Sequence, residues 1–246
     1  MIVSKQETLL RCVTQPDHAR LAAEILSLWR TDGLPEHPRR NSLLFATREH
    51  DNGWREVDSA PRIRPDGAPC TFLDVPDPLR KELWIRGTER YASEEPYAAL
   101  LITRHAMRLH ADRLPQPDAS PDDATAHEPT PWDEFFAALR DRVEELSAAT
   151  EAAEDEADAD AEWLALADGL SLRACGALGD TLQTDLVTAT RRGSELAIDP
   201  FPLAGATTFS VPCRHIPDRH YESDTDLAME LARARWTEFR IRVVGV

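Results

Sequence analysis

The sequence predicts a mainly α-helical protein, a bundle of helices with a small β-sheet formed by strands near its N and C termini. Apolar residues recur at the three- and four-residue spacing of amphipathic helices through most of the chain, and strand-type alternation is confined to the two ends. Hydrophobic residues make up 42% of the sequence, which is enough for a substantial core. No internal repeat is visible, and we expect a single domain over residues 1–246.

The first 30 residues predict a hairpin followed by a helix. In residues 1–14, strand-type apolar residues flank the polar turn SKQET, which is typical of a β-hairpin. In residues 15–30, Pro16 and Asp17 suit a helix start, and His18 falls in the first turn. The apolar residues that follow at helical spacing are Leu21, Ile25, Leu28 and Trp29. The segment is therefore expected to form an amphipathic helix.

A second helix is expected over residues 42–54. Asn41 is a suitable N-cap, and Gly53 loosens the chain at the far end. His50 and Asp51 therefore fall near the C-terminal end of this helix.

The remaining elements are a long loop, further helices and a final pair of strands. The five prolines of residues 59–78 predict an ordered irregular loop, and the proline-rich, acidic segment 115–131 predicts a flexible surface insertion. Helices are expected over 79–93, over 96–114 and in a long region from Trp132, and strands over 206–216 and 237–246 enclose a helix over 224–236.

The charge of the chain excludes some partners. With 44 acidic and 28 basic residues the formal charge is −16, so double-stranded nucleic acid and anionic membranes would be repelled. The N-terminal segment meets charged residues too early for a secretory signal, and no stretch approaches the length of a membrane span. We expect a cytoplasmic protein. The four cysteines form no CxxC pair, which indicates free thiols.

Histidine and aspartate residues on apolar helices are the candidates for chemistry. His18, the adjacent pair His50 and Asp51, and Asp168 belong to three different predicted helices. An unpaired charge on an apolar helix is costly, and near a helix end the adjacent pair can reach a single ion. Imidazole nitrogen combined with carboxylate oxygen suits a divalent metal ion such as manganese, iron, zinc, nickel or magnesium.

These residues resemble the HD-domain superfamily of metal-dependent phosphohydrolases, which has an early helical histidine, an adjacent His-Asp pair and a distant aspartate. The segments TQPDHARLA, HDNGWREVDSAPR, PYAALLITRH and ADGLSL together are also similar, over nearly the whole chain, to a family of bacterial proteins classified as a domain of unknown function. The resemblance implies an HD-domain-like helical bundle. The metal ligands that it implies are His18, His50, Asp51 and Asp168.

The same resemblance implies the roles of further residues. His105 would be an additional metal ligand or a general acid and base, and Asp58 would orient a water or a ligand imidazole. The expected reaction is hydrolysis of a phosphate ester of a nucleotide or another small metabolite, because a bound metal activates water and polarises a phosphoryl oxygen. The residues expected to contact the substrate are Trp54 as an apolar wall and Arg55, Arg62, Arg104 and Arg108 as cations.

Other interpretations of these residues remain open. A lone helical histidine is often a hydrogen-bonded structural residue, Asp58 can cap a turn, Trp54 can belong to the core, and the arginines can neutralise the acidic surplus. No GxSxG, P-loop or GxGxxG motif is present, so a serine hydrolase, a P-loop nucleotidase and a dinucleotide enzyme lack support. The second hypothesis is a non-catalytic sensor or scaffold that keeps the HD-like bundle.

Overall fold

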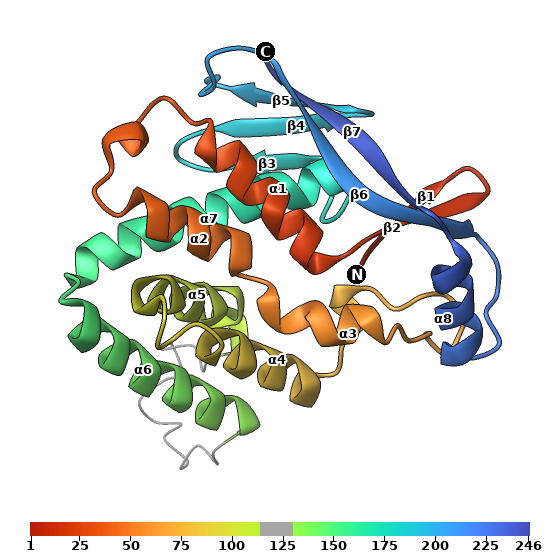
Figure 1. Ribbon diagram of the computed structural model, residues 1–246, viewed down its shortest axis with the longest axis horizontal. Helices are drawn as coiled ribbons and strands as arrows, with labels where there is room; N and C mark the ends of the chain where they lie inside the picture. The colour runs from red at the N-terminus through yellow and green to blue at the C-terminus, as the bar shows by residue number, and fades with distance from the viewer. Residues whose placement is uncertain (114–129) are drawn as a thin grey trace, which may run out of the picture.

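One mixed sheet of seven strands forms a large part of the fold (Figure 1). The computed structural model describes residues 1–113 and 130–246. The strands run in the order β1-β2-β6-β7-β5-β4-β3, and all neighbours are antiparallel except β5 and β7. Their bounds are β1 (Ile2–Gln6), β2 (Leu9–Val13), β3 (Thr181–Gln183), β4 (Thr188–Arg192), β5 (Glu195–Asp199), β6 (Thr207–Pro217) and β7 (Trp236–Gly245).

The helices lie mainly to one side of this sheet. The α-helices are α1 (Gln15–Ser27), α2 (Arg40–Glu49), α3 (Arg55–Ser59), α4 (Asp77–Glu89), α5 (Pro96–Leu109), α6 (Pro131–Thr150), α7 (Glu154–Cys175) and α8 (Asp224–Arg233). The short 3-10 helices are η1 (Leu34–Glu36), η2 (Asn52–Trp54), η3 (Phe72–Asp74) and η4 (Ala111–Arg113).

The predicted fold class, mainly α with a small sheet, is wrong in the size of the sheet. The terminal strands β1, β2, β6 and β7 do join as expected, but β3, β4 and β5 extend the sheet beyond them. Residues 181–199 were not expected to be strands, because each of these strands is short and carries at most two buried residues. Strand β5 is held by parallel pairing with β7, more than 40 residues later, and no local pattern reveals such a pairing.

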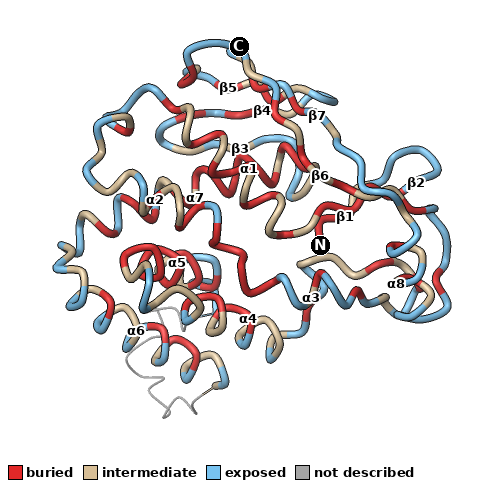
Figure 2. Tube along the Cα trace, viewed as in Figure 1, coloured by how far each residue is buried: buried red, intermediate tan, exposed pale blue. Residues whose placement is uncertain are grey.

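The main core lies between the sheet and helices α1 and α7. Strand β6 alternates buried and less buried residues, so that Phe209, Val211 and Cys213 turn toward these helices. Leu21 of α1 and Leu170 of α7 are buried in the same core. The core continues outward to α2, α5 and α6, as the buried segments in Figure 2 show. A smaller apolar cluster lies where α8 packs on β6.

A local signal explains the start of α1, whereas α2 differs from its prediction at both ends. Thr14 caps α1 by accepting a hydrogen bond from the Asp17 backbone N–H, and a proline stands in the first turn, as predicted. The second helix begins at Arg40 and ends earlier than predicted, at Glu49, so the predicted N-cap Asn41 lies inside it, and the N-cap is Arg39, without a side-chain hydrogen bond. His50 and Asp51 lie in the tight connection between α2 and η2, so the adjacent pair does follow a helix end.

Other predicted elements agree with the structure or lie outside its described part. The N-terminal hairpin, the irregular loop over 59–78 and the terminal strands with α8 between them are confirmed. The predicted flexible insertion at 115–131 lies outside the described residues, except for Thr130, the N-cap of α6, and Pro131, its first residue. All four cysteines are free. Within the described ranges, no helix has both the length and the apolar character needed to cross a membrane.

Gly53 fixes the position of the HDNGW segment against α4. A Cβ atom added at Gly53 would lie 2.2 Å from the Leu83 backbone oxygen, so only glycine allows this contact between η2 and α4. Because His50 and Asp51 come just before Gly53, this close contact also fixes their position relative to α4.

We therefore expect Gly53→Ala to destabilise the protein by about 1–3 kcal/mol, because the added methyl forces backbone apart in a packed region. The control is Gly205→Ala, where nothing lies within 4 Å of the added Cβ, and its stability should match the wild type or exceed it slightly. Urea denaturation followed by circular dichroism measures both. Equal stability of the two variants would contradict the close packing of η2 on α4.

Candidate metal centre

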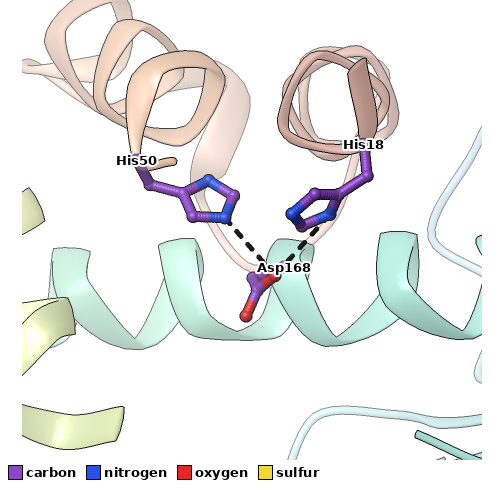
Figure 3. A group of neighbouring side chains, drawn as sticks. All are labelled: His18, His50 and Asp168. Atoms are coloured by element: carbon purple, nitrogen blue, oxygen red, sulfur yellow. Dashed lines mark ion pairs between the residues drawn. The ribbon is translucent and has the colours of Figure 1, made fainter. Parts of the chain in front are cut away.

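Three helices bring two histidines and an aspartate together in the interior. His18 comes from the first turns of α1, His50 from the end of α2 and Asp168 from α7 (Figure 3). Each offers one ligand atom, and these atoms all lie within 4.8 Å of one another. All three residues are buried. The sequence-predicted convergence of these residues is thus present in the fold.

His50 presents a free nitrogen to this cluster. Its Nδ1–H donates to the Thr47 carbonyl oxygen at 2.7 Å, since a carbonyl can only accept. In the neutral imidazole the Nε2 atom then carries a lone pair. This Nε2 is buried without a hydrogen-bond partner, 3.4 Å from Asp168 Oδ1 and 3.7 Å from Asp51 Oδ2. Buried polar atoms are rarely left in this state unless an ion or water is to be bound.

His18 is held at both ring nitrogens. Its Nε2 lies 2.7 Å from Asp51 Oδ2, and its Nδ1 lies 2.9 Å from the Ser171 hydroxyl. That hydroxyl donates to the Asp168 backbone carbonyl, so its oxygen accepts from His18 Nδ1–H. The Nε2 lone pair then faces a carboxylate, and two acceptors so close need a proton or a cation between them. The donor set therefore fits a cation.

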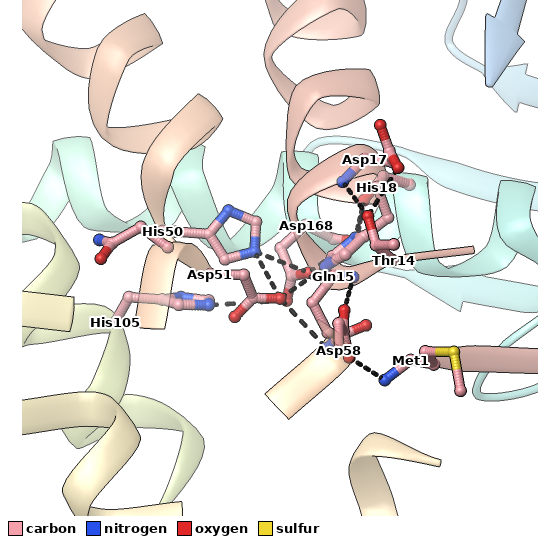
Figure 4. Close-up of polar contacts among 12 residues, drawn as sticks. Met1, Thr14, Gln15, Asp17, His18, His50, Asp51, Asp58, His105 and Asp168 are labelled. Atoms are coloured by element: carbon pink, nitrogen blue, oxygen red, sulfur yellow. Dashed lines mark hydrogen bonds and ion pairs between the residues drawn. The ribbon is translucent and has the colours of Figure 1, made fainter. Parts of the chain in front are cut away.

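Asp51 lies within reach of both histidines, with its Oδ2 2.7 Å from His18 Nε2 and 3.7 Å from His50 Nε2. Its Oδ2 atom also accepts a hydrogen bond from Gln15 Nε2 at 3.1 Å (Figure 4). Gln15 is the first residue of α1, and sequence reasoning missed it. Ser171 was missed as well, although its spacing of three residues from Asp168 places both on one face of α7.

His105 of α5 completes the group of imidazoles. Its Nε2 lies 3.6 Å from Asp168 Oδ2, and its ring packs edge-on against the ring of His50 at 5.2 Å between centroids. Both of its nitrogens are buried without a hydrogen-bond partner. The structure thus places His105 where either predicted role, metal ligand or proton carrier, is sterically possible.

Burial and neighbouring charges shift the pKa values of the cluster residues in different directions. Burial lowers the pKa of His105 to about 4, against a smaller opposing effect of Asp168, so His105 is neutral near pH 7. Burial also acts to lower the pKa of His50, but the carboxylates of Asp51 and Asp168 outweigh it and raise the pKa to about 9. Burial alone would raise the pKa of Asp168, yet the facing histidines, His50 first, hold it far below its usual range.

Asp58 does not face the cluster. Its Oδ1 accepts from the N-terminal amine of Met1 at 2.5 Å, and its Oδ2 accepts from the Gln15 backbone N–H at 2.6 Å. The carboxylate therefore anchors the start of β1 and the start of α1. It touches the cluster only through Gln15, which in turn binds Asp51.

The cluster lines a cavity of about 930 Å³. Trp54 and Arg108, both predicted to contact substrate, line it too, although Trp54 is also packed edge-on against Phe72. Two arginines that sequence reasoning missed, Arg80 and Arg173, belong to the same lining. Arg173 lies on α7, five residues after Asp168, and this shared helix was the signal available in the sequence.

The other predicted arginines are directed elsewhere. Arg55 binds Glu49 Oε2 at 2.5 Å, and Arg104 pairs with Asp158 on the outer part of α7. Arg62 lies beside a separate, smaller cavity. The arrangement therefore does not bring these three guanidinium groups to the His and Asp cluster.

The fold and the cluster define a protein in which helices packed on a mixed sheet enclose a buried His/Asp centre at a large cavity. The family described as "Protein of unknown function (DUF3891)" matches residues 1–218, and the chain belongs to this family. The matched part contains every residue of the cluster. No curated protein and no solved structure matches the chain.

The raised pKa of His50 makes stability depend on pH in protein kept free of metal by a chelator. The histidine has a pKa of about 6.5 when unfolded and about 9 when folded, so its contribution is fully present below pH ~6.5 and is lost as the pH rises to about 9. We expect the free energy of unfolding to fall by on the order of 3 kcal/mol over this interval.

The matched control is His50→Asn, which can still donate to the Thr47 carbonyl but does not titrate. The difference in pH dependence between wild type and variant, from urea denaturation at several pH values, isolates the histidine from other groups. If the free energy of unfolding changed equally with pH in both proteins, Asp51 and Asp168 would not share a proton with His50.

Proposed function

We propose that the protein is a metal-dependent hydrolase of phosphate esters, related in its active site to HD-domain phosphohydrolases. The observation that carries the proposal is the His50 Nε2 atom, which is buried without a hydrogen-bond partner and directed at two carboxylates on the wall of a large cavity. A protonated His50 carries one positive charge against two buried carboxylates, and a divalent ion would balance both.

The ligands in this proposal are His18, His50, Asp51 and Asp168. Their outer contacts hold them in place as such contacts do in metal sites: the Thr47 carbonyl fixes the tautomer of His50, and the Ser171 hydroxyl fixes that of His18. When bound, a divalent ion would lower the pKa of a water toward neutrality and polarise a phosphoryl oxygen.

The residues around the ligands would handle the proton and the substrate charge. Hydrolysis adds water to phosphorus, breaks the ester P–O bond and gives the released alcohol a proton. Neutral His105, with both nitrogens free, is placed to accept a proton from water and return it to the alcohol. Arg173 lines the cavity and would attract the phosphate, whereas Arg108 lines it in an ion pair with Glu162.

The non-catalytic alternative differs from this proposal in turnover rather than in metal content. A sensor or scaffold would keep the ion and the cavity and show no hydrolysis. The two are separated by measuring metal content and turnover on the same preparation.

We expect the purified protein to bind about one or two divalent ions per chain and to hydrolyse small phosphomonoesters when loaded. His50→Ala and Asp51→Ala should each weaken metal binding by more than about 100-fold and remove turnover. Elemental analysis and a phosphate-release assay with manganese, zinc, nickel, iron and magnesium measure the two effects.

The control is His215→Ala, since His215 lies on β6, outside the lining of the cavity. It should keep both metal and activity. A folded protein that binds none of these metals after supplementation would contradict the proposal, and a metal-loaded protein without turnover on a broad phosphomonoester panel would favour the sensor.

A further inference from the structure

Exposed leucines surround the mouth of the cavity. Among the described residues, eight large apolar side chains are exposed, and four of them line this cavity. They are Leu73 at 58% exposure, Leu109 at 46%, Leu178 at 46% and Leu186 at 39%. The four come from η3, the end of α5, the loop after α7 and the turn between β3 and β4. Four separate segments thus place leucine at one opening of an acidic protein.

Apolar groups also line the cavity close to Asp168. On α7, Gly169 and Leu172 lie one and four residues beyond Asp168, and Leu182 of β3 faces them. A Cβ atom added at Gly169 would lie 3.0 Å from Leu182 Cδ2, so the helix and the strand approach closely here. Within about one helical turn of Asp168 the cavity wall therefore carries aliphatic groups, with the Arg173 guanidinium beside them.

Leu178 is exposed at a backbone position that disfavours it. Its φ is +56°, in the left-handed region, between Gly176 at +83° and Gly179 at +80°. Glycine or asparagine is the usual residue in this region, and leucine has neither the conformational freedom nor a polar group to compensate. A strained, solvent-exposed leucine at the mouth of a cavity points to a function for its side chain.

From these features we propose that the substrate is a phosphorylated amphiphile with an unbranched apolar chain. Its phosphate lies at the His50 and Asp168 end, and its chain leaves the cavity between Leu178 and Leu186. This inference rests on the proposed phosphohydrolase function and names its substrate class. The volume of about 930 Å³ is in the range of small-molecule sites, and the four leucines line this cavity, which favours the alkyl chain of a small ligand over a protein surface as the binding partner.

The test measures binding of phosphonates, which cannot be hydrolysed, to the full chain with Mn²⁺ by calorimetry. Ethyl-, butyl-, hexyl- and octylphosphonate are used below their micelle concentrations. Burying each methylene should tighten binding about four-fold, so octylphosphonate should bind at least on the order of 100-fold more tightly than butylphosphonate.

Two variants test where the alkyl chain of the phosphonate lies in the cavity. Leu178→Asn keeps a residue that tolerates the left-handed backbone, and Leu186→Ser shortens the opposite side of the mouth. Each should weaken octylphosphonate by about 10-fold and leave ethylphosphonate unchanged. The control is Leu9→Ser, because Leu9 is 40% exposed but lies on β2, away from the cavity.

The outcomes separate this inference from the proposed function. Dissociation constants independent of chain length, absence of binding by every phosphonate, or an equal effect of Leu9→Ser would overturn the inference. Hydrolysis of short phosphomonoesters without chain-length dependence would leave the phosphohydrolase proposal standing alone. Chain-dependent binding without hydrolysis of octyl phosphate by any metal form would support an amphiphile site and contradict the enzyme.

Discussion

Two carboxylates buried among three histidines are the constraint on which the arrangement of the helices depends. Asp51 and Asp168 are buried by the apolar helices around them. An uncompensated charge there would cost a free energy comparable to the whole net stability of a typical fold. The nearest compensation is a proton or a cation held between them and the imidazoles of His18 and His50. Helices α1, α2 and α7 must therefore meet where these four side chains meet.

The rest of the fold supports that meeting point. Gly53 lets η2 lie directly on α4, and Asp58 binds the start of β1 and the start of α1 together, so the adjacent pair and His18 keep their relative positions. The sheet backs α1 and α7 from the other side. Its unexpected strand β3 and the turn between β3 and β4 also line the cavity, so the extension of the sheet matters for what the centre can bind as well as for stability.

The parts that could be predicted from the sequence are those with local signals. His18 in the first turn of a capped helix, the pair at a helix end and Asp168 on an apolar helix have clear periodicity around them, and the family resemblance ties them together. Strands β3 to β5 have little local signal, because each is short with at most two buried residues, and β5 joins the rest of the sheet only through β7, more than 40 residues later. The choice among arginines could not be made either: Arg104 and Arg173 look alike in sequence, and only the packing of α7 directs one outward to Asp158 and the other to the cavity.

Anomalous diffraction from crystals grown with Mn²⁺ tests the central claim most directly, because it locates the ion without reference to activity. The account predicts one strong peak within bonding distance of His50 Nε2 and an Asp168 carboxylate oxygen, with His18 or Asp51 completing the ligands. Absence of a peak at this position under saturating Mn²⁺, with His50 Nε2 instead protonated and bonded to Asp168, would contradict it: the cluster would then be a proton-linked structural network.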